Sequence, residues 1–194
     1  WTYDSTAPTI TIATTSPITP VVTTLAGSGT AGSTDGTGTA ASFNNPSGVA
    51  VDGSGNVYVA DQSNHLIRKI TPGGVVTTLA GSGSQGSTNG TGTAALFSGP
   101  NGVAVDGGGN VYVADQYNHL IRKITSAGVV TTLAGSGSAA SANGTGTAGS
   151  FFWPSGVAVG GSGNVYVADY ENHLIRKITP GGVVTTLAGS GSQG

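Results

Sequence analysis

The feature that most constrains this sequence is an internal repeat of 54 residues. The tripeptide Asn-His-Leu begins at Asn64, Asn118 and Asn172, in steps of 54. Residues 47–86 and 155–194 are identical at 37 of 40 positions. One short copy cannot bury all of its apolar side chains alone, so the copies must stack on one another.

Each repeat contains four short segments rich in Val, Ile, Thr and Tyr, which suit a pleated, half-buried surface. In the first copy they are Gly48–Asp52, Asn56–Asp61, Leu66–Thr71 and Val75–Ala80. Gly, Ser, Asn and Pro between them favour tight turns. A β-solenoid usually has a shorter period, so the pattern predicts an all-β fold of four-stranded antiparallel propeller blades.

Two longer motifs identify the type of repeat. The segment F-x-x-P-x-G-V-A-V-D runs from Phe43 to Asp52, and G-N-V-Y-V-A-D-x-x-N-H-L-I-R-K-I runs from Gly55 to Ile70. They recur three times and resemble the NHL-repeat family, in particular its secreted bacterial members. The resemblance implies a β-propeller of typically six blades, so three copies would form part of a six-bladed or longer array.

The repeat also divides the chain. Residues 21–194 are predicted to form propeller blades joined by loops rich in Gly, Ser and Thr. Val21–Ala26 has the sequence of a fourth strand, V-V-T-T-L-A, and is predicted to be a spare strand. Residues 1–20 lie outside the period and resemble a strand and linker at the end of a bacterial immunoglobulin-like module. The repeats themselves cover about residues 43–80, 97–134 and 151–188.

Charge and composition limit the classes of partner that can be expected for this sequence. Only 7% of the residues are charged and the net charge is −2, so nothing favours nucleic acid or an anionic membrane. No stretch approaches the roughly 18 apolar residues of a membrane helix. The absence of Cys excludes disulfides and thiolate metal sites. Hydroxyl-rich loops and the immunoglobulin-like junction favour an extracellular or cell-surface location.

The repetition itself argues against an active site, because catalysis needs different groups in different roles. All three histidines are the histidine of the repeat, and we expect each to bond near its own turn, with the preceding Asp as partner. One residue of each Arg-Lys pair should pack against an Asp. The predicted structural set is Asp61, His65, Arg68, Asp115, His119, Arg122, Asp169, His173 and Arg176.

We therefore predict no catalytic residue, no metal and no cofactor. Calcium in the long loops is a weaker alternative, because the single Asp35 is replaced by Asn89 and Asn143 in the other copies. The channel-lining first strands show only small and aliphatic residues. The other possible function is a propeller-type lyase, whose catalytic and metal-binding residues would lie in blades absent from this sequence.

The residues that break the repeat are the candidates for binding. They should share one face, because the loop before the first strand and the turn after the second lie at the same end of a blade. Aromatic rings beside a carboxylate suit a sugar or a protein partner. Alternatively, Phe152 and Trp153 pack beneath the glycine-rich loop, as Phe43, Phe97 and Phe151 would. The candidates are Phe152, Trp153, Tyr170, Glu171 and Tyr117.

The sequence thus predicts a non-catalytic extracellular scaffold or binding module. Its propeller would recognise a protein or glycan partner, or build a surface assembly. Near-identical blades with unpaired edge strands also permit self-association, in which strands of different chains pair.

Overall fold

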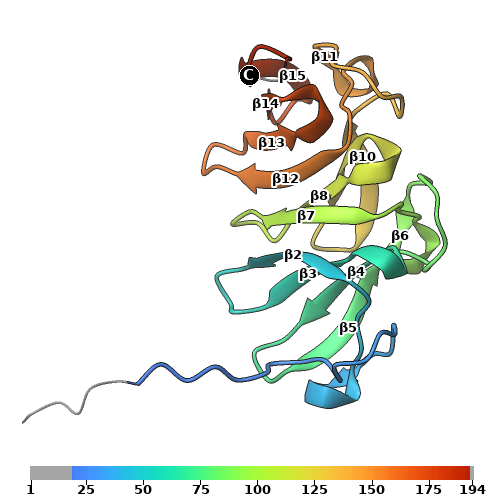
Figure 1. Cartoon of the computed structure of the whole chain (residues 1–194), viewed down its shortest axis with the longest axis vertical. Coiled ribbons are helices and arrows are strands. Elements are labelled where there is room, and N and C mark those ends of the chain that lie inside the picture. The colour runs from blue at the N-terminus through green and yellow to red at the C-terminus, as the bar shows by residue number, and fades with distance from the viewer. Residues whose placement is uncertain (1–18, 193–194) are drawn as a thin grey trace, which may run out of the picture.

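The computed structural model describes residues 19–192 and contains three antiparallel sheets stacked along one direction (Figure 1). Blade 1 consists of β1 (Gly36–Thr37), β2 (Pro46–Val51), β3 (Val57–Asp61), β4 (Leu66–Ile70) and β5 (Val75–Ala80). Blade 2 consists of β6 (Gly90–Thr91), β7 (Pro100–Val105), β8 (Val111–Asp115), β9 (Leu120–Ile124) and β10 (Val129–Ala134). Blade 3 consists of β11 (Gly144–Thr145), β12 (Pro154–Val159), β13 (Val165–Asp169), β14 (Leu174–Ile178) and β15 (Val183–Ala188).

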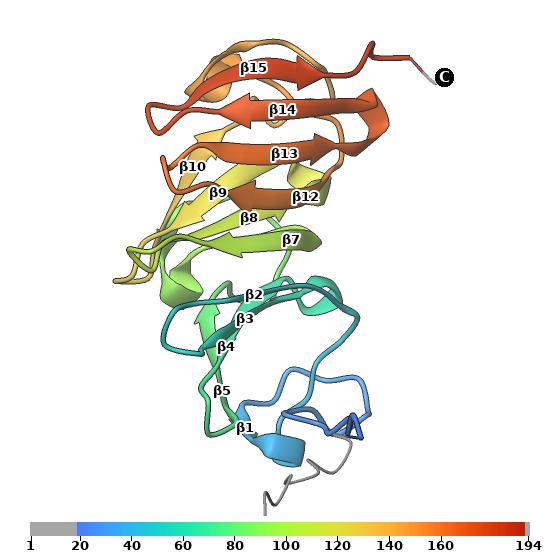
Figure 2. The same cartoon turned by 90° about the vertical axis from the view of Figure 1, so that its left-hand side faces the viewer.

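Every blade has the same strand order, β1-β5-β4-β3-β2 in blade 1 and its equivalents in the others. Four of the strands follow one another along the chain, which Figure 2 shows most clearly for β12 to β15. The prediction of four-stranded antiparallel propeller blades is confirmed, and a short fifth strand is added. That strand comes from the loop before the blade, where the dipeptide Gly36-Thr37 gave no strand signal in the sequence.

Single turns of 3-10 helix complete each repeat. They are η1 (Gly38–Ala40), η2 (Gln62–Asn64), η3 (Gly92–Ala94), η4 (Gln116–Asn118), η5 (Gly146–Ala148) and η6 (Tyr170–Asn172). Each is three residues long, so none in residues 19–192 has the length or apolar character to cross a membrane. The turns η2, η4 and η6 each end at a histidine in the left-handed region, where φ is 54–56°.

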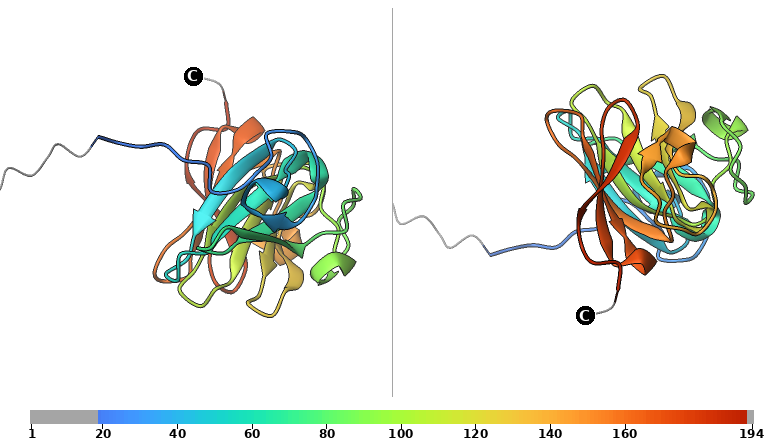
Figure 3. Two further views of the ribbon diagram at one scale, coloured as in Figure 1. Left: turned by 90° about the horizontal axis from the view of Figure 1, so that it is seen from below. Right: turned by 90° about the horizontal axis from the view of Figure 1, so that it is seen from above.

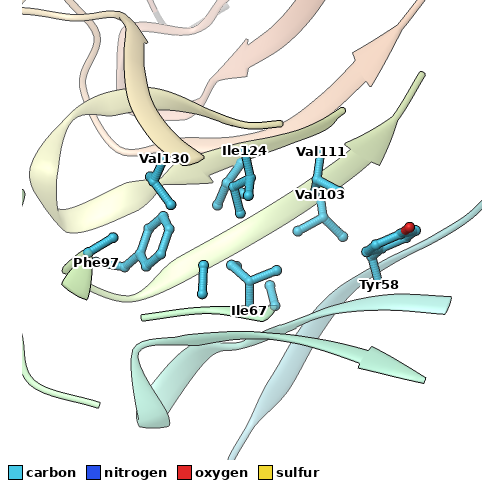
Figure 4. Close-up of a cluster of buried hydrophobic side chains, with 11 residues drawn as sticks. Tyr58, Ile67, Phe97, Val103, Val111, Ile124 and Val130 are labelled. Carbon is cyan, nitrogen blue, oxygen red and sulfur yellow. The ribbon is translucent and has the colours of Figure 1, made fainter. Parts of the chain in front are cut away.

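The core lies between neighbouring blades. Tyr58 and Ile67 of blade 1 face Phe97, Val103 and Ile124 of blade 2 (Figure 4). A second cluster of the same kind joins blade 2 to blade 3. Each fully buried aliphatic or aromatic side chain contributes about 1.5–3 kcal/mol, so stacking supplies the stability that a single blade lacks.

The first strands of successive blades approach most closely. A Cβ at Gly48 would collide with the carbonyl oxygen of Asn101, and one at Gly102 with that of Ser155. The Ser47 hydroxyl donates to the Asn101 carbonyl at 2.9 Å across the same contact. Glycine is therefore required where strands of adjacent blades pass side by side, and the sheets lie one behind another (Figure 3).

The predicted spare strand at Val21–Ala26 is wrong. This segment is extended or bent and belongs to no sheet, and Val22 is 98% exposed. In the repeats, the V-V-T-T-L-A strand pairs with an L-I-R-K-I strand that begins nine residues earlier. The equivalent residues here read I-A-T-T-S and lie, with the other predictions for residues 1–18, outside the described part.

Candidate binding face

A buried Arg–Asp pair joins the elements of every blade. In blade 1, Arg68 Nη1 donates to Asp61 Oδ2 at 2.8 Å and to the Ser42 carbonyl at 3.1 Å. The other oxygen of Asp61 accepts the Asn44 backbone N–H at 2.7 Å, and the Asn64 amide donates to Asp61 Oδ2 at 2.9 Å. Both charged side chains are fully buried. The pair recurs at 2.8 Å in the other two blades.

The second nitrogen of the same guanidinium reaches the glycine-rich loop. Arg68 Nη2 donates to Asp35 at 2.6 Å, and its counterparts Arg122 and Arg176 donate to Asn89 and Asn143. Each guanidinium also lies over a phenylalanine ring, with the centroid of Phe43, Phe97 or Phe151 at 5.2, 5.2 or 5.4 Å. A buried charge needs such partners to offset its desolvation. The three arginines of the predicted structural set thus hold the strand, the glycine-rich loop and the turn of their blade together.

The histidines bond differently from the prediction. His65 Nδ1 accepts the backbone N–H of Gly99 at 3.1 Å, and His119 Nδ1 accepts that of Trp153 at 3.2 Å. The expected Asp partner was wrong, because Asp61 is already filled by a backbone N–H, an amide and a guanidinium. Each of these two histidines therefore links its blade to the next one.

Burial lowers the pKa of His65 below its ordinary value of 6.5, and it also lowers the pKa of His119, against an opposing effect from the Asp169 carboxylate. The neutral imidazole is the form that this geometry requires, because Nδ1 can accept a hydrogen bond only when it carries no proton. The end of the blades that carries His65, His119 and His173 is called the histidine face below.

Three of the five predicted binding residues form one cluster on the histidine face. The rings of Tyr117 and Trp153 are 5.9 Å apart at 65°, and those of Phe152 and Trp153 are 5.8 Å apart at 69°. Phe152 also contacts the His119 ring, with centroids 5.6 Å apart. Tyr117, Phe152 and Trp153 are named the aromatic patch, which spans the junction between blades 2 and 3.

The patch is accessible to a ligand. Tyr117 is 49% exposed and Trp153 is 40% exposed, whereas Phe152 is half-buried beside them. The alternative packing of Phe152 and Trp153 beneath the glycine-rich loop does not occur. Phe151 takes that position, where it bridges to Ala139 of the loop and is fully buried.

Tyr170 and Glu171 lie beside the patch on η6. The Glu171 backbone N–H donates to the Phe152 carbonyl at 3.1 Å, which fixes the turn against the loop. Tyr170 is 61% exposed, and no ring contact joins it to the patch within the described residues. Its counterparts Gln62 and Gln116 bond to each other across blades at 3.4 Å.

The residue before the first strand, which is Trp153 in the patch, has the same backbone conformation in all three blades. Asn45, Gly99 and Trp153 occupy equivalent positions with φ of 51°, 56° and 50°. In blade 1 the Asn45 amide donates to the Ser63 hydroxyl at 3.0 Å, and in blade 2 the Tyr117 ring lies directly over Gly99. An aromatic residue in the left-handed region is a rare and costly choice. The sequence indicated the unusual residue but not this conformation.

A further departure lies at the opposite end of the blades. Asp52 accepts bonds from Asn56 and from the Tyr58 hydroxyl, and Asp106 does the same in blade 2. The hydrogen bonds from Asn56, above all, lower the pKa of Asp52 to about 2, and burial with the bond to Asp52 raises that of Tyr58 to about 12. Blade 3 has Gly160 at this position, a break in the repeat that the sequence reasoning missed.

The first strands are also more polar than expected. They begin two residues earlier than predicted, which adds Ser47, Asn101 and Ser155 to their small and aliphatic residues. The Asn101 amide donates to Gln116 at 3.2 Å. Among residues 19–192, no three His, Asp or Glu side chains gather closely enough to hold a metal ion.

Comparison with known sequences decides the type of repeat. The NHL-repeat family matches residues 43–70, 97–124 and 151–178. The chain contains three NHL repeats. Over 94 residues it is 37% identical to the chloroplastic protein SUPPRESSOR OF QUENCHING 1 of Arabidopsis thaliana and 39% identical to NHL repeat-containing protein 2 of Gallus gallus. The matches cover 48% and 47% of this NHL chain, but only 9% and 13% of those two proteins.

Solved structures share the fold at low identity. An auxiliary nutrient binding protein of Bacteroides thetaiotaomicron superposes with a TM-score of 0.60 and 22% identity, over 71% of this chain and 36% of that one. A gluconolactonase of Xanthomonas campestris superposes with a TM-score of 0.55 and 14% identity, over 75% and 48%. These NHL repeats therefore have the fold of longer proteins that include both binding proteins and enzymes.

Proposed function

We propose that this NHL chain is a non-catalytic binding module and that the aromatic patch is its ligand site. One observation carries the proposal. The exposed rings of Tyr117 and Trp153 meet where the repeat is broken, on a backbone that carries Asn45 and Ser63 in blade 1. Since blade 1 has the same backbone conformation with polar residues there, that conformation does not require the rings, which supports a role for them in binding.

The buried polar groups support a binding role rather than catalysis. Every Arg–Asp pair repeats the same bonds at the same distances, and two of the three histidines hold a backbone N–H of the next blade. Groups that are held in structural bonds are poor acids, bases or nucleophiles, although the buried Nε of each of these arginines has no partner. The fold itself does not distinguish a binding role from catalysis, because similar structures include both a binding protein and an enzyme.

The proposal places the module outside the cell or at its surface, in a protein with further blades. Val49 and Val51 on the outer side of blade 1 are 67% and 60% exposed, whereas the equivalent Val103 in the middle blade is buried. Further NHL blades would bury such faces.

Protease treatment of intact cells that carry the tagged full-length protein tests the proposed location outside the cell or at its surface. That location is refuted if the tag survives until the cells are lysed.

The binding role is tested by printing neutral and acidic polysaccharides and extracellular matrix proteins on one array. The chain is compared with the variant Phe152→Asn/Trp153→Asn, which restores the residues of blade 1 at a backbone that already has the same φ. The control is Asn44→Ala/Asn45→Ala. The proposal requires at least one signal that the first variant loses and the control keeps. If every signal is the same in all three proteins, the patch is not the site.

A further inference from the structure

We infer that the ligand of the aromatic patch is a neutral oligosaccharide, which stacks on Trp153 and extends over Tyr117. This inference rests on the proposed function and adds the chemical class of the ligand. It follows from three properties of the histidine face: its rings, its charge and its extent.

The rings supply the apolar contact. A sugar ring presents C–H groups on its faces and hydroxyl groups around its edge, so it matches a flat aromatic surface bordered by polar groups. Trp153 and Tyr117 are both partly exposed and meet edge to face at 5.9 Å. Phe152 supports Trp153 from the side at 5.8 Å and is itself held against His119. The exposed rings are therefore fixed before any ligand arrives, which reduces the entropy lost on binding.

The charge excludes an acidic ligand. The three arginines are fully buried in their Asp pairs. Lys69 and Lys123 lie over the rings of Tyr58 and Tyr112, whose hydroxyls bond Asp52 and Asp106 at the opposite end of the blades. Lys177 is in register with Tyr166, at the equivalent position of blade 3.

No lysine or arginine of the described residues thus reaches the histidine face, and Nδ1 of His65 and of His119 accepts a backbone N–H, which only the neutral imidazole can do. The half-buried Glu171 adds a negative charge there. A carboxylated or sulfated polysaccharide would meet repulsion with no lysine or arginine there to offset it. The carboxylate of Glu171 can instead accept hydrogen bonds from sugar hydroxyls.

The small extent of the aromatic patch favours a small ligand over a protein. A stable protein interface takes about 800 Å² on each partner, with roughly 20–30 residues. On the histidine face, the aromatic departures from the repeat are confined to a few side chains near one junction, while blade 1 keeps Asn44, Asn45 and Ser63. Two exposed rings with one carboxylate match one or two sugar units.

Tryptophan fluorescence provides the test. Trp1→Phe leaves Trp153 as the single tryptophan of the chain, so its emission reports on the patch alone. This protein is titrated with neutral hexasaccharides of glucose, xylose and mannose, and with polygalacturonate as the acidic probe. We expect a saturable change in emission with at least one neutral hexasaccharide, with Kd in the range of about 10 μM to 1 mM.

Two variants complete the test, with calorimetry as the readout because one of them lacks the reporter. Trp153→Asn should weaken binding of that hexasaccharide at least tenfold, whereas Asn45→Ala should leave it unchanged. The inference is overturned if no neutral hexasaccharide binds below about 10 mM, or if polygalacturonate binds more tightly. It also fails if Trp153→Asn binds as well as the parent. A patch-dependent signal from a matrix protein on the array, without any from sugars, would sink this inference and leave the proposed function standing.

Discussion

Blade 1 and blade 3 share nearly the same sequence and backbone, yet they differ on the histidine face. Both contain a fully buried Arg–Asp pair at 2.8 Å and a left-handed residue before the first strand. Blade 1 presents Asn45 and Ser63 there, and blade 3 presents Trp153 and Glu171. The comparison separates what the fold requires, which is the buried pair, from what it tolerates, which is the exposed residue.

The largest effect should come from the feature the two blades share. Arg68→Met and Arg176→Met each leave a buried aspartate without its cation, which costs about 3–5 kcal/mol in unfolding free energy. Asp35 adds only an exposed second carboxylate in blade 1, so the two losses should agree within about 1 kcal/mol. Urea denaturation measures both. A much smaller loss in either blade would show that its ion pair is not part of the required structure.

Gly99 occupies, in blade 2, the position equivalent to Asn45 and Trp153, where the fold tolerates different residues. An alanine Cβ there would press on the Tyr117 ring, and φ is 56°. Gly99→Ala should lower the unfolding free energy by about 1 kcal/mol, with Asn45→Ala as the control at the equivalent position. Chemical denaturation gives both values. An Ala variant as stable as the parent would mean that Tyr117 moves away freely and is not a fixed part of the patch.

Gly160 sharpens the comparison at the other end of the blades. Gly160→Asp would give the Tyr166 hydroxyl and the Asn164 amide the acceptor that Asp52 supplies in blade 1. We expect a gain of about 0.5–1.5 kcal/mol for the restored hydrogen bonding, seen as a higher thermal midpoint. Gly160→Asn is the uncharged control and should gain less. No gain from the aspartate would mean that the turn in blade 3 has a different geometry.

The histidines predict a dependence on pH. Because burial lowers the pKa of His65 and His119 below 6.5, the unfolded chain takes up protons first as the pH falls. Their contribution to stability is complete above pH 6.5 and decreases as the pH drops below that value. The urea midpoint should therefore fall between pH 7 and pH 5, and His65→Gln/His119→Gln should flatten the change. An equally steep change in the double variant would assign it to other groups.

Binding at the patch should follow the same protonation. His119 Nδ1 holds the Trp153 backbone, so a proton on that nitrogen removes the acceptor and loosens the ring that stacks on the ligand. Affinity for the bound hexasaccharide should fall several-fold from pH 7 to pH 5 when measured by Trp153 emission. His65→Gln, at the equivalent contact with Gly99, should leave this dependence unchanged. The role of His119 in positioning is refuted if affinity is constant over that range.

Much of the fold follows from the sequence because the repeat aligns every strand with its copies. Turn residues bound the four main strands, and one residue of the Arg-Lys pair, Arg68, packs against an Asp, whose identity as Asp61 the sequence did not specify. The short strand at Gly36–Thr37 could not be predicted, because glycine has no strand preference and pairing with β5 creates it. The partner of His65 lies 34 residues away in the next blade, beyond any local pattern.

The candidate site was predictable in part for the same reason. Departures from a repeat are visible in a sequence, which is how Phe152, Trp153 and Tyr117 were found. Their mutual contact depends on the angle between two blades, which no spacing specifies. Val21 and Val22 show the opposite case, since a strand sequence lies here in no sheet and pairs with no strand among residues 19–192.

The link from a histidine to the next blade has a consequence for how such chains diversify. His65 and His119 hold the backbone of Gly99 and Trp153, so the side chain at that position can change while the main chain stays in place. Each duplication of the repeat therefore adds one more replaceable residue on the same face. A lineage could acquire new ligands by substitutions at residues 99 and 153 without having to evolve a new fold.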